Sequence, residues 1–247
     1  MPTAIYLALS TAFASFVKQV AGFGNTLIIT TLFAFVMESR LISPLALIIT
    51  TPANIVLLVK ERKKIQIKKI LPITCLVLAG VIPGTFFLKV GDDRVLKIVL
   101  GIFIILLAVE MATRGRSNVP TGARGKIGTL AIGLITGIMA GLFGISTTLA
   151  AYMHRTTEGR GSFRGSLAFV FLTENLFRVF YYWANGLFSR EAGIHALWLL
   201  PFFALGVFAG IRADRHISDK ALNAFVIVLL ILSGASLVIK NAMALAG

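Results

Sequence analysis

The sequence predicts an all-α integral membrane fold made of two four-segment repeats, the second inverted relative to the first, with a broken, re-entrant first segment in each. Two observations predict the membrane class. Apolar residues form 57% of the chain and charged residues only 14%, against about 25% charged residues in soluble domains. Stretches such as 41–59 and 70–88 contain no Asp, Glu, Lys or Arg, and their length of roughly 20 residues is enough to cross a bilayer.

A third observation, an internal repeat, predicts the two-part organisation. Short matches recur in the same order in both halves: Phe23-Gly24 with Phe143-Gly144, Asn54 with Asn175, and Gly80 and Gly84 with Gly206 and Gly210. We therefore expect a first membrane repeat at 1–112, a basic linker at 113–126 and a second membrane repeat at 127–247. Transporters with such repeats place their substrate between the two copies.

Four apolar helical segments are expected in each repeat, at 3–36, 41–59, 70–89 and 94–112, and at 127–153, 164–188, 192–211 and 219–240. The first segment of each repeat contains glycines at its centre, in AGFGNT at 21–26 and GLFGISTT at 141–148. As one straight helix, 3–37 would extend about 52 Å, against a hydrocarbon core of about 30 Å. A helix break at the glycines resolves this mismatch, since irregular backbone is tolerated where it is buried in protein or lines a cavity.

The distribution of Lys and Arg predicts the topology. If the first and fifth segments enter and leave on one face, the connections on one side carry 16 basic residues and those on the other side carry 6. If all eight segments cross, the counts are 12 and 10. The positive-inside rule favours the first arrangement, in which 60–69, 113–126, 154–164 and 212–220 share a side and the two halves are inverted.

Composition also excludes several functions. The net charge of +14 falls mostly between apolar runs, as membrane loops require, so no nucleic-acid partner is expected. Cys75 is the only cysteine and the three histidines are scattered, which leaves no thiol pair and no metal cluster. The sequence contains no G-x-S-x-G or H-E-x-x-H motif. We therefore expect neither an enzyme nor a cofactor.

The two glycine breaks are the predicted substrate site. A helix that begins after a glycine turn directs free backbone N–H groups and a positive dipole end at what precedes it, and two such starts near the membrane midplane form an anion site. The glycines have a second interpretation, that they only allow close helix packing. The residues assigned to substrate binding at the breaks are Gly22, Phe23, Gly24, Asn25, Thr26, Gly141, Gly144, Ser146 and Thr147.

Charged residues inside apolar segments add to this site. Lys18 lies one helical turn before Gly22; it pairs with the anion in one interpretation and snorkels to an interface in the other. Glu174 and Arg178 are four residues apart on one helix face. Arg178 is assigned to substrate binding and Glu174 to proton coupling, with a self-neutralising ion pair as the alternative. Gln19, Asn54 and Asn175 are further candidate binding residues.

Other polar and aromatic residues are expected to be structural. Asp93 and Asp219 begin the fourth and eighth segments, where an acidic residue caps a helix N-terminus. The aromatic residues, among them Tyr182, are expected in the core or at the membrane interface.

The four-segment duplication, the stretches AGFGNTL and AGLFGISTTL, and the glycine pairs before each acidic helix start resemble the sulfite exporter TauE/SafE family, also called toluene sulfonate uptake permeases. The resemblance covers nearly the whole chain. Asn25-Thr26 and Ile145-Ser146 stand where family members often have glycines and a proline. The resemblance implies transport of small sulfur anions such as sulfite or sulfonates across the bacterial inner membrane.

These observations together predict a multi-pass secondary transporter that binds a small sulfur-containing anion and alternates access between its two repeats. Its partners are the lipid bilayer and a coupling proton or sodium ion. An anion channel, a membrane-embedded enzyme and a scaffold are the alternative functions.

Overall fold

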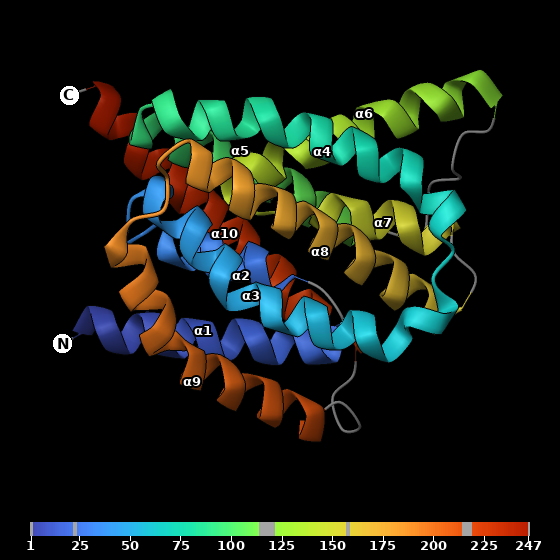
Figure 1. The fold of residues 1–247 in the computed structure, drawn as a ribbon. Helices are drawn as coiled ribbons and strands as arrows, with labels where there is room; N and C mark the ends of the chain where they lie inside the picture. Colours follow the sequence, from blue (N-terminus) through green and yellow to red (C-terminus); the bar gives the residue numbers. More distant parts are fainter. Residues whose placement is uncertain (1, 22–23, 114–121, 157–158, 214–218, 247) are drawn as a thin grey trace. The chain divides into compact units, whose positions relative to one another are not determined.

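The computed structural model describes residues 2–21, 24–113, 122–156, 159–213 and 219–246. In these residues the chain is entirely helical apart from short connections, and it contains no strand (Figure 1). The helices are α1 (Pro2–Ala21), α2 (Asn25–Phe33), α3 (Ser39–Glu61), the 3-10 turn η1 (Arg62–Lys64), α4 (Ile67–Val90), α5 (Asp93–Thr113), α6 (Gly122–Phe143), α7 (Thr147–Thr156), α8 (Arg160–Ala184), α9 (Arg190–Ala213) and α10 (Asp219–Ala246). The all-helical membrane class is therefore confirmed.

Both predicted breaks are present. Gly24 separates α1 from α2 and has a φ of 93°, and Gly144 lies between α6 and α7 with a φ of 72°. Glycine adopts this left-handed backbone without the steric penalty that a Cβ brings. The Tyr6 hydroxyl near the start of α1 donates to the Leu32 carbonyl near the end of α2, at 2.9 Å. The chain therefore turns back at Gly24, and α2 returns along α1.

The chain divides into two compact units. The first contains residues 1–49, 91–116 and 189–247, and the second contains 50–90 and 117–188. Each unit thus combines helices from both of the predicted repeats. Residues 114–121 of the predicted linker lie outside the described residues, and the chain is helical from Gly122.

In the first unit, α1 packs against α9 through the predicted glycine pair. A Cβ at Gly206 would overlap the carbonyl of Ala12, and one at Gly210 would lie 2.9 Å from the carbonyl oxygen of Phe16. Both contacts advance in the same direction along the two helices, so α1 and α9 run parallel. Small residues bring the two backbones into this close contact.

Also in the first unit, α5 packs against α10. Gly101 and Gly234 face each other at the crossing, and the Arg94 guanidinium donates to the Ala244 carbonyl at 2.7 Å. The start of α5 therefore meets the end of α10, and these two helices, each the last of its predicted repeat, run antiparallel.

In the second unit, the glycine pair of the first repeat makes the equivalent contact. A Cβ at Gly80 would lie 2.5 Å from the Leu134 carbonyl oxygen, and one at Gly84 would overlap the carbonyl of Ile138. Hence α4 and α6 run parallel, as α1 and α9 do. Figure 1 shows α7 returning toward the end of the unit where α6 begins.

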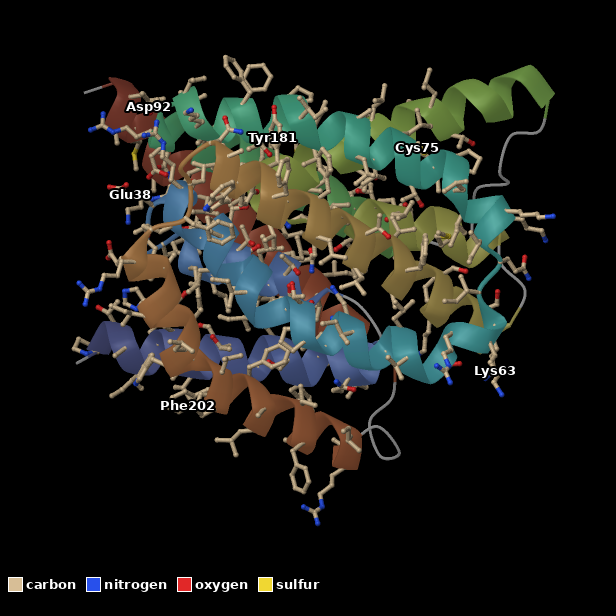
Figure 2. All side chains as sticks on the ribbon, viewed as in Figure 1. Glu38, Lys63, Cys75, Asp92, Tyr181 and Phe202 are labelled. Carbon is tan, nitrogen blue, oxygen red and sulfur yellow. The ribbon has the colours of Figure 1, made fainter. Side chains whose placement is uncertain are left out.

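Two of the basic connections lie at the same end of the second unit. Gly161 at the start of α8 approaches the Lys64 side chain of η1, and Gly165 approaches Glu61. Lys63 projects from this connection in Figure 2. The positive-inside rule predicts that the connections at 60–69 and 154–164 share a side, and this contact supports that topology.

The predicted helix cap at Asp93 is wrong by one residue. The Asp92 carboxylate accepts the backbone N–H of Arg94 at 2.9 Å and that of Val95 at 3.3 Å, so Asp92 caps α5. Asp93 instead accepts the backbone N–H of Ser39 at 2.8 Å and pairs with Lys97 at 2.7 Å. Its carboxylate ties the start of α5 to the start of α3.

Six of the described helices are long and apolar enough to cross a membrane by length and composition, namely α1, α3, α4, α5, α9 and α10. The apolar part of α6, Gly128–Phe143, is shorter. Their exposed apolar side chains, such as Phe86, Leu205 and Phe208, suit contact with lipid. The fold is that of a multi-pass membrane protein.

Candidate functional site

The first break holds a polar side chain whose amide donors have no partner among the described residues. Asn25, the first residue of α2, is only 4% exposed. Its side-chain oxygen accepts from the Thr26 hydroxyl at 3.4 Å, but its amide nitrogen has no hydrogen-bond partner among the described residues. The first N–H groups of a helix also lack acceptors within the helix. A buried amide donor and a helix start thus lie together at the end of the Gly24 turn.

Lys18 lies in the last turn of α1, just before this break, and is 7% exposed. A snorkelling lysine keeps its charged end in water. Because Lys18 is buried, snorkelling does not explain its position. Gln19 packs against Gly210 of α9, where an added Cβ would lie 2.7 Å from the Gln19 Cβ. Gly22 and Phe23 lie outside the described residues.

The second break is organised by a carboxylate. Ser146 directly precedes α7, and its hydroxyl donates a short hydrogen bond to Oε2 of Glu174 on α8. Ser146 and Thr147 are 6% and 5% exposed. The hydroxyl of Thr148, in the first turn of α7, is buried and has no hydrogen-bond partner in the described part of the chain.

A polar chain continues along α8 from this carboxylate. Oε1 of Glu174 accepts from Nη1 of Arg178 at 3.4 Å. Nε and Nη2 of Arg178 donate to the Tyr182 hydroxyl at 3.2 and 3.0 Å, and this hydroxyl donates to the Gly141 carbonyl at 2.6 Å. All three side chains are at most 2% exposed. Burial of such a set is stable only because each charge and donor is matched.

A second polar contact in this unit joins α8 to α3. The Asn175 amide donates to the Thr51 hydroxyl at 3.0 Å, and Asn54, one turn along α3, is buried at 4% exposure. Asn54 and Asn175 occupy matching positions of the two predicted repeats. Both lie in the second unit and both are buried.

The predicted site residues are therefore found in two groups. The first unit contains Lys18, Gln19, Gly24, Asn25 and Thr26; the second contains Asn54, Gly141, Gly144, Ser146, Thr147, Glu174, Asn175 and Arg178. Within the second group, Ser146, Glu174, Arg178 and the Gly141 carbonyl form one connected network. Glu174 and Arg178 form the buried ion pair that the sequence offered as the alternative to their assigned roles.

Tyr182 is the residue that sequence reasoning missed. The sequence predicts it only in the core or at an interface, yet it joins Arg178 to the Gly141 carbonyl. The signal was its spacing, since Glu174, Arg178 and Tyr182 follow at intervals of four residues and so share one helix face. Between Thr173 and Ala184, this face of α8 carries the charged side chains in a mostly apolar stretch.

The polar groups at the two breaks are mostly hydrogen-bond donors. In the described residues, no group of three or more His, Cys, Asp and Glu side chains is placed to hold a metal. What the two breaks offer is hydrogen-bond donors in the form of an amide, hydroxyls, a guanidinium and helix starts.

Comparison with known proteins identifies a family over most of the chain. The family model described as "Sulfite exporter TauE/SafE" matches residues 7–237 of 247. This span includes both breaks and the whole network on α8. Neither the curated proteins nor the solved structures contain a match to the chain.

Proposed function

Since this chain belongs to the sulfite exporter TauE/SafE family of membrane transporters, we propose that it carries a small sulfur oxyanion, sulfite or an organosulfonate, across a bacterial inner membrane by alternating access. The family is not one of enzymes.

One observation carries the choice of an anion. At the first break, the buried Asn25 amide has a donor that no described residue satisfies and lies at a helix start, and the buried Lys18 precedes the break in the last turn of α1. A buried donor without an acceptor costs about 1–3 kcal/mol, so a bound oxyanion that accepts from it gains affinity. The first-repeat site residues Lys18, Gly24, Asn25 and Thr26 therefore bind substrate oxygens.

The second group of residues completes the proposed function. Ser146, Thr147 and Arg178 supply further donors, Gly141, Gly144, Asn54 and Asn175 shape the polar surroundings, and Glu174 carries the coupling proton. Antiparallel packing of the two last helices of the repeats, α5 and α10, supports the inverted relation of the repeats. Inverted repeats allow a transporter to exchange inward-facing and outward-facing states.

The test uses purified protein, with binding followed by thermal shift and flux by uptake of radiolabelled sulfite into proteoliposomes. Asn25→Ala and Lys18→Ala are each expected to raise the sulfite Kd by about 10–100-fold, because each removes about 1.5–3 kcal/mol of a hydrogen bond to a charged group. A bound ligand stabilises the folded state by mass action, which makes the shift a measure of Kd.

Matched controls exist for both changes. Asn241 is also buried, but its amide donates to the Leu237 carbonyl of its own helix at 2.8 Å, and Lys89 is exposed at the end of α4. Asn241→Ala and Lys89→Ala should leave sulfite binding unchanged. Wild-type affinity in both site variants would refute the assignment, and flux that does not saturate with sulfite would identify a channel instead of a carrier.

A further inference from the structure

The Glu174 carboxylate makes the contacts that a bound oxyanion would make at the second break. One oxygen accepts from the Ser146 hydroxyl and the other from the Arg178 guanidinium. A hydroxyl at a helix start and a guanidinium are typical ligands of sulfonate-like and phosphate-like groups. The Glu174 carboxylate therefore occupies hydrogen-bond donors that could also bind a substrate anion.

Arg178 has a second anchor that does not depend on Glu174. Two of its nitrogens donate to the Tyr182 hydroxyl at 3.2 and 3.0 Å, and its Cζ lies 4.9 Å from the centre of the Tyr182 ring. Tyr182 is fixed in turn by its 2.6 Å hydrogen bond to the Gly141 carbonyl. The guanidinium therefore keeps its place if the carboxylate leaves.

The contact between Glu174 and Arg178 is the loosest in the network. Their closest atoms are 3.4 Å apart, whereas charge-assisted N–H···O bonds are usually about 2.7–2.9 Å long. The nearby Thr148 hydroxyl is buried and without a hydrogen-bond partner in the described residues. A sulfonate or sulfite anion has three oxygens and can accept from both Ser146 and Arg178, as the carboxylate does, with one oxygen left for a further donor.

We propose that Glu174 is an internal competitor of the substrate: the oxyanion displaces its carboxylate from Ser146 and Arg178, and Glu174 takes up one proton as it is displaced. This inference deepens the proposed function and rests on it, because it requires that a sulfur oxyanion binds this protein. It makes anion binding and the Glu174–Arg178 ion pair mutually exclusive.

Charge balance requires that one proton is taken up when the anion binds. With Glu174 ionised, Arg178 and the carboxylate form a neutral buried pair. A monovalent sulfonate that takes the carboxylate's place neutralises Arg178 and leaves a buried carboxylate without its partner, which is strongly unfavourable. One proton from the solvent, added to the carboxylate oxygen, restores neutrality. Binding therefore consumes one proton per monovalent anion.

Few other titratable groups are described around Glu174. On α8 it faces Arg178, with Tyr182 beyond. Ser146 approaches from the α7 side, and α6 between Gly128 and Phe143 contains no titratable residue. On α4, the residues between 70 and 88 include only Cys75, which is exposed and is labelled in Figure 2. Glu61 and Lys64, which pair with each other, lie beside Gly165 and Gly161 at the start of α8. Among the described side chains of α4, α6 and α8, Glu174 is the only carboxylate, so it is the proton acceptor of this proposal.

The experiment uses methanesulfonate, because this monovalent anion does not itself titrate near neutral pH. Binding to wild-type protein in weakly buffered detergent solution is followed by thermal shift, and the accompanying change in solution pH counts protons. We expect uptake of about one proton per bound anion, as charge balance requires. In Glu174→Gln, which keeps the shape and removes the charge, proton uptake should vanish and the Kd should fall by at least about tenfold.

Glu61→Gln is the matched control. Glu61 pairs with Lys64 at 3.1 Å at the loop end of the same unit, so the variant also removes one carboxylate from an ion pair, but far along the chain from the break. It should match wild type in Kd and proton count. If Glu174→Gln does not fold, the proton count on the unaltered protein still decides the proposal.

The outcomes separate the two proposals. No binding of methanesulfonate or sulfite to wild-type protein overturns the proposed function. Binding without proton uptake, or an unchanged or weaker affinity in a folded Glu174→Gln, overturns only the role of Glu174 as a competitor. Proton uptake in wild type that is lost in Glu174→Gln, together with tighter binding, supports both.

Discussion

At the first break α2 begins after Gly24 with the buried amide of Asn25, and at the second α7 begins after Gly144 beside Ser146, whose hydroxyl bonds to Glu174. The backbone is similar, since both glycines have a positive φ. The polar contents differ: an unmatched donor occupies one break and a donor matched by an internal carboxylate occupies the other. The two breaks thus share a positive-φ glycine but differ in whether a described side chain satisfies their buried donor.

The largest expected effect tests how far the second break depends on its charges. Arg178→Ala leaves the Glu174 carboxylate buried without its cation, and we expect a loss of about 3–5 kcal/mol in the free energy of unfolding. Denaturant unfolding in detergent micelles measures it. Arg40, whose guanidinium donates to the Gly91 carbonyl at 3.2 Å in an exposed contact, provides the control, and Arg40→Ala should cost less than about 0.5 kcal/mol. Similar losses in the two variants would mean that the network does not hold the second break.

Features that depend on local sequence were the ones that could be predicted. The breaks follow from glycines in segments too long for one crossing, and the pairing of Glu174 with Arg178 follows from helix periodicity. The parallel glycine contacts of α4 with α6 and of α9 with α1 use the two glycine pairs that marked the repeat. The determinants of the breaks, the ion pair and the glycine spacing lie within a few residues of each other, whereas the helices that the glycines contact are distant in the chain and were not predicted.

Features that depend on distant residues could not be predicted from one sequence. Ser146 and Glu174 are 28 residues apart, and Tyr182 and Gly141 are 41 apart; only the packing of α6, α7 and α8 brings them together. The sequence alone does not separate Asp92 from Asp93 as the cap of α5, because two adjacent aspartates are equally good caps. The Ser39 N–H, 54 residues away, engages Asp93 and leaves Asp92 as the cap.

A smaller effect sharpens the contrast between the two polar groups. Ser146→Ala removes a hydrogen bond to a buried carboxylate, and we expect it to cost about 1.5–3 kcal/mol. Asn25→Ala removes an amide whose donors have no partner among the described residues, and should cost less than about 1 kcal/mol in the absence of anion. Unfolding of both variants, with and without saturating sulfite, measures the difference. If the two variants lose the same free energy of unfolding without anion, the hydrogen bond of Ser146 to Glu174 does not distinguish the second break from the first.

The smallest effect tests whether the backbones of the two breaks are equivalent. Gly24→Ala and Gly144→Ala each place a Cβ on a residue with φ of 93° or 72°, and we expect each to cost about 1–2 kcal/mol. At Gly24 no atom lies within 4 Å of the added Cβ, so its cost reports backbone conformation alone. Gly193→Ala is the control, because Gly193 is helical and equally uncrowded; it should stabilise by roughly 0.5–1 kcal/mol. If the free energy of unfolding falls much more at Gly144 than at Gly24, the backbones of the two breaks are not equivalent. If the two losses are equal, the breaks differ only in the side chains of Asn25, Ser146 and Glu174.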